Sequence, residues 1–507
     1  MSSATALSWF ARHELRLAWR EWLAVMTGGR RKRTRAAVIG LLLFAALLHV
    51  PAWAVIGRLA DLQLPLDKSS LIVITATIFL AWTLMLSQAI ESVTRAFYAR
   101  ADLDLIMSSP ATLANLFSVR IAAIALAVTV LALLFSTPFI DVLVIGGGPR
   151  WLAAFGVVVA MGLSAAAIAI AVTILLFRLI GPARTRFVAQ ILAAIIGAGF
   201  VIALQVAAIM SYGTLSRITI LTSGTFAEHA PDLDSIWWWP ARAVMGDSEA
   251  LLLLLALGLV LLGSVMAIFS GRFADTAIDA AAYGTSGRRS AQRPFRGGSR
   301  QQALRRKEFS LLWRDPWLIS QTLMQLLYLV PPALLLWRSF ADRSAALTLI
   351  TPVIVMAAGQ LAGGLAWLTI SGEDAPDLVA TAPLTPSSVI RAKIEVVLIA
   401  IAVIFCPLVA TLAFASPIQA AVSAVAIIIS AASATAIQLW FRVQARRSQF
   451  RRRQTSSRLA TFAEAFSSIG WAATAALLLA LPLAGLISGL ITASLVAITW
   501  KFSPRRE

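Results

Sequence analysis

Long apolar runs are the feature that most constrains how this chain folds. Twelve stretches carry few charged residues, at about 36–57, 70–93, 118–141, 151–177, 187–211, 250–270, 317–338, 345–370, 391–415, 418–440, 461–481 and 484–500. A helix crosses the hydrocarbon core of a bilayer with about 20 apolar residues. At 59% hydrophobic and 13% charged, the 507 residues are more apolar than a soluble core requires. We predict an all-α polytopic membrane protein with about 12 transmembrane helices. The last two runs are two spans or one broken helix.

The charged residues between the runs predict how the chain is oriented. Arginine-rich blocks occur at 28–35, 286–306 and 441–458, whereas the loop at 212–249 is acidic. Basic loops stay on the cytoplasmic side of a membrane. We therefore predict a protein integral to the cytoplasmic (inner) membrane, with these blocks and both termini in the cytoplasm and the acidic loop outside. The net charge of +19 also fits anionic headgroups, so we expect membrane lipids and no nucleic acid as partners.

Two amphipathic segments precede the two sets of spans. Residues 8–26 place Leu15 and Trp19 on one helical face and charged side chains on the other, which is typical of a helix lying at the membrane interface. A shift of 294 residues aligns RHELRLAWRE with RKEFSLLWRD. The residues assigned to the two interfacial helices are Glu14, Trp19, Arg20, Trp22, Glu308, Trp313, Arg314 and Trp317.

A second internal match links DLDLIMSSPATLANLFSVR with APDLVATAPLTPSSVIRAK. A shift of 273 residues aligns Asp104 with Asp377, Pro110 with Pro383, and Arg120 with Lys393. Matches in the same order predict two parallel six-helix repeats, each preceded by an interfacial helix. The expected domains are a first half at 1–270, a cytoplasmic linker at 271–304 and a second half at 305–507. Pro110 and Pro383 are expected to begin helices that nearby Thr or Ser residues cap.

The usual signatures of catalysis are absent from the sequence. It has no Walker motif, no GxSxG, no HExxH and one cysteine, Cys406, and its three histidines are widely separated. We therefore expect no enzyme activity, no metal site and no cofactor bound by this chain. Glu91, Glu395 and Glu464 lie near cytoplasmic ends of spans, where the charge reaches water easily. The GxxxG pattern at 359–363 indicates close helix packing.

Glutamines within the spans have two interpretations. They line a transport pathway, or they form hydrogen bonds between helices. The pathway candidates are Gln88, Gln205, Gln325 and Gln360.

The order of these elements resembles the membrane permease of type-2 ABC exporters, in a fused form that carries both halves in one chain. The resemblance rests on the interfacial helix, two spans, a D-L-x-x-x-x-x-P-x-T segment and four more spans. It implies that the two segments dock on a separate ATPase subunit, present in two copies, which holds ATP and magnesium. The docking residues it implies are Asp104, Leu105, Pro110, Thr112, Leu116, Asp377, Leu378, Pro383, Thr385 and Val389.

Other functions compete with an exporter permease. A twelve-span ion-coupled secondary transporter fits the span count, although intramembrane acids are nearly absent and the interfacial helices have no obvious role there. A membrane enzyme lacks a catalytic constellation, and a scaffold does not need duplicated polar loops. Each docking segment is alternatively a solvated turn between spans. The substrate expected from the resemblance is lipid-like or amphipathic.

Overall fold

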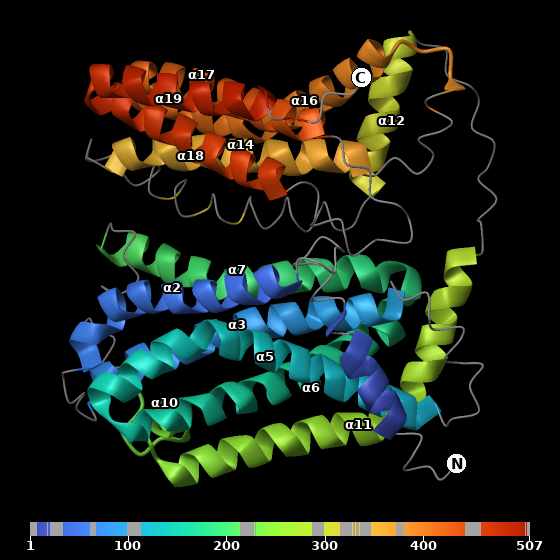
Figure 1. Ribbon diagram of the computed structural model, residues 1–507, viewed down its shortest axis with the longest axis vertical. Helices are drawn as coiled ribbons and strands as arrows, with labels where there is room; N and C mark the ends of the chain where they lie inside the picture. Colours follow the sequence, from blue (N-terminus) through green and yellow to red (C-terminus); the bar gives the residue numbers. More distant parts are fainter. Residues whose placement is uncertain are drawn as a thin grey trace. The chain divides into compact units, whose positions relative to one another are not determined.

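The computed structural model shows a chain whose regular elements, where described, are all helices. The described residues are 8–17, 19–20, 34–60, 67–98, 113–212, 228, 230–285, 299–314, 327, 330, 334, 346–371, 379, 381–441, 458–501 and 503. Contacts between Cα atoms divide the chain into two units (Figure 1). Unit 1 comprises residues 1–204 and 216–289, and unit 2 comprises residues 205–215 and 290–507.

Ten of the described helices are long and apolar enough to cross a membrane. The chain is therefore an all-α membrane protein. These segments are Lys68–Phe97, Phe117–Gly147, Pro149–Ile180, Arg184–Ala207, Ser248–Phe269, Ile350–Ile370, Pro386–Ala415, Pro417–Phe441, Phe462–Ala480 and Pro482–Lys501. The first expected span coincides with α2 (Thr34–Ala60), which contains Pro51. The expected span at 317–338 lies outside the described residues except at 327, 330 and 334.

Unit 1 is built around α6 (Ala153–Ile180), which contacts α3 (Lys68–Tyr98), α5 (Leu113–Gly147) and α11 (Ser248–Thr285). Small residues let these helices approach closely. At Gly162 on α6, for example, a Cβ atom would collide with Thr129 on α5. The α2 helix packs on α5, and Ser87 on α3 donates a 2.7 Å hydrogen bond to the Ala193 carbonyl on α7 (Pro182–Tyr212).

One end of unit 1 brings three chain turns together. The Lys68 ammonium, at the start of α3, donates to the Ala230 carbonyl at 3.2 Å and lies 3.6 Å from the Asp232 carboxylate. Gly246 has a φ of +104° and lies against Arg150. Arg150 belongs to the short helix η2 (Pro149–Leu152), which precedes α6. This end also holds η3 (Ile236–Trp238) and α10 (Trp239–Val244). The spans of unit 1 therefore alternate in direction, as the sequence predicts.

Unit 2 is built around α14 (Ala346–Ser371). This helix contacts α16 (Pro386–Ala415), α17 (Pro417–Phe441) and α18 (Arg458–Ala480), and α18 packs against α19 (Pro482–Lys501). In Figure 1 these helices run roughly along one direction, and α12 (Arg300–Arg314) lies at a steep angle to them. The helices α11 and α12 both reach into the expected linker at 271–304, since α11 ends at Thr285 and α12 begins at Arg300.

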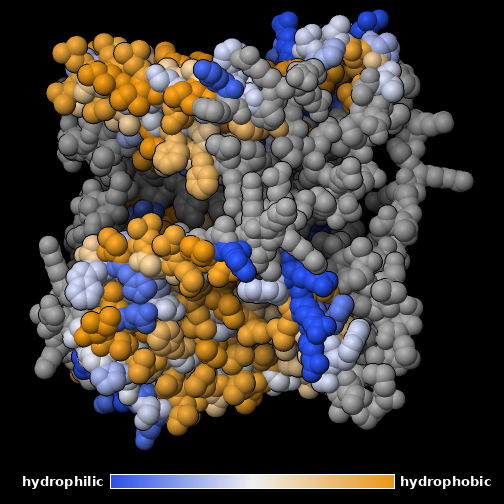
Figure 2. Space-filling model, viewed as in Figure 1, coloured by the Kyte–Doolittle hydropathy of each residue, from blue (hydrophilic) through white to orange (hydrophobic). Residues whose placement is uncertain are grey.

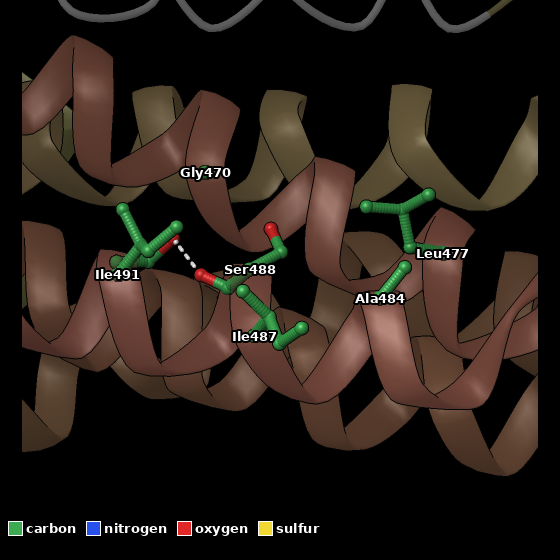
Figure 3. A pocket seen from close by; sticks show the side chains of 7 residues that line it. Gly470, Leu477, Ala484, Ile487, Ser488 and Ile491 are labelled. Atoms are coloured by element: carbon green, nitrogen blue, oxygen red, sulfur yellow. Dashed lines mark hydrogen bonds between the residues drawn. The ribbon is translucent and has the colours of Figure 1, made fainter.

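The last two apolar runs are two antiparallel helices. Gly470 faces Thr492, the hydroxyls of Thr474 and Ser488 lie 3.1 Å apart, and Gly485 lies against Leu478. As the residue number rises on α18, it falls on α19, which defines a hairpin with Leu481 at its turn. Figure 3 shows Leu477 beside Ala484 near that turn, in a groove lined by the two helices. The two runs are therefore two separate helices rather than one broken helix, and each is long and apolar enough to cross a membrane.

The outer faces of both units are apolar. Hydrophobic residues, orange in Figure 2, cover much of the surface of the described helices. Large exposed side chains include Leu42, Leu43 and Leu47 on α2, and Val403 and Phe414 on α16. Faces of this kind suit contact with lipid tails rather than water.

Candidate docking site

The second docking segment lies just before α16, and only part of it is described. Pro383 and Thr385 are exposed, Val389 is half-buried in the first turns of α16, and Asp377 and Leu378 lie outside the described residues. In the first segment, Leu116 belongs to α5, whereas Asp104, Leu105, Pro110 and Thr112 lie outside the described residues. The geometry of one segment can thus be examined.

The helix after this segment starts later than the sequence interpretation placed it. The first residue of α16 is Pro386, not Pro383, and Thr385 at the N-cap has extended φ and ψ of −72° and 136°. A residue before proline is driven out of the helical region, so Thr385 cannot extend the helix backwards. The Thr385 side chain makes no capping hydrogen bond, and its carbonyl instead accepts from the Ser388 amide at 3.0 Å. The expected side-chain cap is therefore wrong for this helix.

The two amphipathic segments are helical where they are described. In unit 2 the segment is α12, which contacts α14 and α16. Trp313 is 79% exposed on α12, and Trp19 is likewise exposed in the N-terminal segment. Arg20 is exposed, Arg314 is the last residue of α12, and Trp22 and Trp317 lie outside the described residues.

The acidic residues of these helices are buried, although the amphipathic pattern placed Glu14 on the polar face. Glu14 is 4% exposed and Glu308 is fully buried. Both carboxylate oxygens of Glu308 accept hydrogen bonds of 2.9 Å from the Lys393 ammonium on α16. The same ammonium donates to the Thr369 carbonyl near the end of α14. One mostly buried ammonium, 12% exposed, therefore joins α12, α14 and α16.

A second group of polar contacts joins α12 and α16 nearer the surface. The Glu395 carboxylate accepts from Arg305 at 2.6 Å, from Arg391 at 2.8 Å and from Gln301 at 3.2 Å. Gln301 also donates to the Ser388 carbonyl at 3.5 Å. Because Ser388 follows the exposed segment at 383–387, α12 is fixed directly beside the start of α16.

The first half also buries the residues that match Glu308 and Lys393. The repeat alignment pairs Glu14 with Glu308 and Arg120 with Lys393, and Glu14 and Arg120 are both buried within unit 1. The sequence reasoning matched each residue with its repeat partner but missed the ion pair between Glu308 and Lys393. The sequence did hold a signal for this ion pair, because an acidic and a basic residue recur at the two aligned positions in both halves.

Polar residues within the spans fall into two groups. Gln88 and Gln205 are half-buried, Gln360 is exposed and Gln325 lies outside the described residues. Gln419 and Gln438 instead make contacts between helices: the Gln419 amide donates to Thr351 at 3.0 Å, and the Gln438 amide donates to Glu464. In unit 1, the His49 ring lies 3.4 Å from the Asp141 carboxylate across α2 and α5.

Within the described part of the chain, no cluster of three or more His, Cys, Asp or Glu residues is arranged to hold a metal ion. Cys406 is exposed on α16.

Comparison with known proteins finds no matching family model, no similar curated protein and no similar solved structure.

Proposed function

We propose that this chain is the transmembrane permease subunit of an ATP-driven ABC exporter, made of two parallel six-span halves. A separate ATPase, in two copies, would bind ATP and magnesium and dock on the segments at 104–116 and 377–389. The substrate class that fits the apolar helix faces is a lipid-like or amphipathic compound. The chain would lie in the cytoplasmic membrane with both termini inside.

The attachment of α12 to the start of α16 is the observation that carries this proposal. A docking element transmits force only if it is rigidly joined to the spans behind it. The Glu308–Lys393–Thr369 contacts join α12 to two spans. Pro383 and Thr385 just before α16, and Ser387 in its first turn, remain exposed and accessible to a partner. A solvated turn alone would not require such an attachment.

The similar burial of Glu14 and Arg120 supports two equivalent halves. A charged side chain is costly to bury, so the burial of an acidic and a basic residue at the matched positions is more than a coincidence of composition. We expect Glu14 and Arg120 to fix the N-terminal interfacial helix beside the first docking segment in the same way.

The docking surface can be tested by purifying the tagged full chain from its native membrane in mild detergent. We expect a chain with a Walker motif to copurify, and the combination of Asp377→Arg with Pro383→Gly to reduce its yield at least tenfold. Asp234→Arg, in the predicted outer loop, is the matched control and should leave the yield unchanged. Unchanged association in the double variant would remove the docking assignment, and ATP hydrolysis by the purified chain alone would contradict the proposal.

An ion-coupled secondary transporter is the second candidate, and Glu464 favours it. This carboxylate lies between three helices of unit 2, where a carrier commonly places a titratable group. Transport driven by an ion gradient in vesicles that contain no ATPase would decide for this candidate.

A further inference from the structure

Glu464 is a partly buried residue of α18, and its carboxylate packs against α14 and α17. On one side, the Gln438 side-chain amide on α17 donates a hydrogen bond to Oε2. On another side, the carboxylate lies so close to Gly363 on α14 that a Cβ atom there would collide with Oε1 and Oε2. Three helices therefore position one carboxylate.

No cation neutralises this carboxylate within the described part of the chain. The helices α14 and α17 contain no Asp, Glu, Lys, Arg or His over their full lengths. On α18 the other charged residue is Arg458, and on α19 it is Lys501. The charged residues of α16 are Arg391, Lys393 and Glu395, which pair with one another or with α12. Glu464 has no ion pair with any of them.

A second polar layer lies one helical turn away. The hydroxyls of Ser430 on α17 and Ser468 on α18 both lie against Gly359, where a Cβ atom would collide with them. These two serines and Ser467 are fully buried, and among the described residues their hydroxyls have no hydrogen-bond partner. Because Gly359 precedes Gly363 by four residues, and Ser468 follows Glu464 by four, the two layers are stacked along the same seam.

Buried hydroxyls, and a partly buried carboxylate, that have no partner among the described residues are costly unless something binds there. A buried hydroxyl without a partner loses about 1–3 kcal/mol, and an uncompensated carboxylate loses more. Protonation at Oε1 removes the negative charge and leaves Oε2 to accept from Gln438. A water molecule bound by the serines would satisfy their hydroxyls and lie next to the carboxyl.

We propose that Glu464 is a reversible proton-binding site inside unit 2, and that water held by Ser430 and Ser468 exchanges the proton with it. On uptake, a hydronium ion gives its proton to Oε1 and becomes water. On release, the proton returns to water, and Glu464 becomes a carboxylate held by Gln438. The site does not depend on an ATPase partner.

Carbodiimide labelling of the purified full chain tests this site. A hydrophobic carbodiimide adds to a protonated carboxyl group and leaves a stable acylurea adduct, which mass spectrometry locates. We expect an adduct on Glu464 whose yield falls as the pH rises, and none at that position in Glu464→Gln. Glu395, held by two arginines, is the matched control and should remain unlabelled.

A second variant separates a proton site from a carboxylate that is merely packed. Gln438→Leu removes the hydrogen bond that stabilises the ionised form, so labelling should persist to a higher pH by at least a tenfold change in proton concentration. No adduct at any pH, or an unchanged profile in a folded Gln438→Leu chain, would overturn the proposal. Protection by sodium chloride but not by choline chloride at constant pH would also overturn it, by assigning the site to a metal cation. These readouts need no ATPase, so they are independent of the docking test.

Discussion

At the scale of single residues, the ion pair between Glu308 and Lys393 stabilises the packing of α12 against α16. Removing Lys393 takes both 2.9 Å hydrogen bonds from the fully buried Glu308 carboxylate and leaves it the longer contact to Lys307 at 3.6 Å. Breaking a buried ion pair costs up to about 3–5 kcal/mol. We expect Lys393→Met to lower the midpoint of thermal unfolding in detergent strongly, and Glu308→Lys combined with Lys393→Glu to recover part of the loss. Arg305→Gln is the control, because Glu395 keeps Arg391 and Gln301 and lies nearer the surface. An equal loss in the control would show that the buried pair has no special weight.

Asp247 is a second residue with a defined energetic role, at the start of α11. Its Oδ1 accepts from the amides of Glu249 at 3.1 Å and Ala250 at 3.2 Å, and its Oδ2 lies 2.9 Å from the Arg242 guanidinium. The Ala250 amide, followed by the charge of Arg242, lowers the pKa of Asp247.

Because the pKa of Asp247 is lower in the folded state, its contribution to stability is complete above the pKa of the unfolded chain, about 3.9. The contribution falls as the pH drops through the folded pKa. We expect Asp247→Ala to cost about 1 kcal/mol at neutral pH, and the difference from the unmodified chain to shrink in acid. Thermal unfolding at several pH values measures this difference. Asp234→Ala, at an exposed position, is the control and should leave the midpoint at neutral pH unchanged. A constant loss for Asp247→Ala at all pH values would refute the assignment.

At the scale of elements, the α18–α19 hairpin depends on glycine at its closest approach. A Cβ atom on Gly485 would lie 2.6 Å from the Leu478 amide nitrogen and 2.8 Å from its Cα, and neither backbone atom can move aside. We expect Gly485→Ala to cost about 1–3 kcal/mol through overpacking. Gly489→Ala is the matched control, since its nearest contact is the Thr474 methyl group at 3.3 Å. The midpoint of thermal unfolding compares the two, and equal midpoints would show that the hairpin is less tightly packed at its turn.

The helices were predictable from the sequence because a span needs its apolar residues in one continuous run. The ends of the helices were not predictable. The helix α11 continues to Thr285 and α3 continues to Tyr98, beyond the apolar runs, where contact with lipid no longer requires apolar residues. Buried Glu308 was also missed. Local periodicity places a charge on a solvated face, whereas its partner Lys393 lies 85 residues further along the chain. The stacked polar layers at Glu464 and Ser468 were missed for the same reason, because they form only when α14, α17 and α18 pack together.

At the scale of the whole molecule, the described contacts agree with one alternating path through each unit. In unit 1, Lys68, Arg150, Asp232 and Gly246 meet at one end. In unit 2, Thr351 near the start of α14 lies 3.0 Å from Ser423 on α17, and the Lys393 contacts join the opposite end of α14 to the start of α16. Within each unit, these contacts define which connections between helices lie at the same end of the bundle. The positions of the arginine-rich segments predict which end faces the cytoplasm.

That sidedness can be measured with introduced cysteines, because the chain has one native cysteine to remove. In a Cys406→Ser background, Asp234→Cys lies in the predicted outer loop and Ser387→Cys in the second docking segment, and both positions are exposed. A membrane-impermeant maleimide should label the first in intact cells and the second only after lysis, by at least a tenfold difference in yield. Labelling of Ser387→Cys in intact cells would place the segment outside, where no ATPase could reach it. If an added ATPase protects Ser387→Cys from the maleimide after lysis, the ATPase docks on this segment, because docking and labelling compete for the same exposed residues.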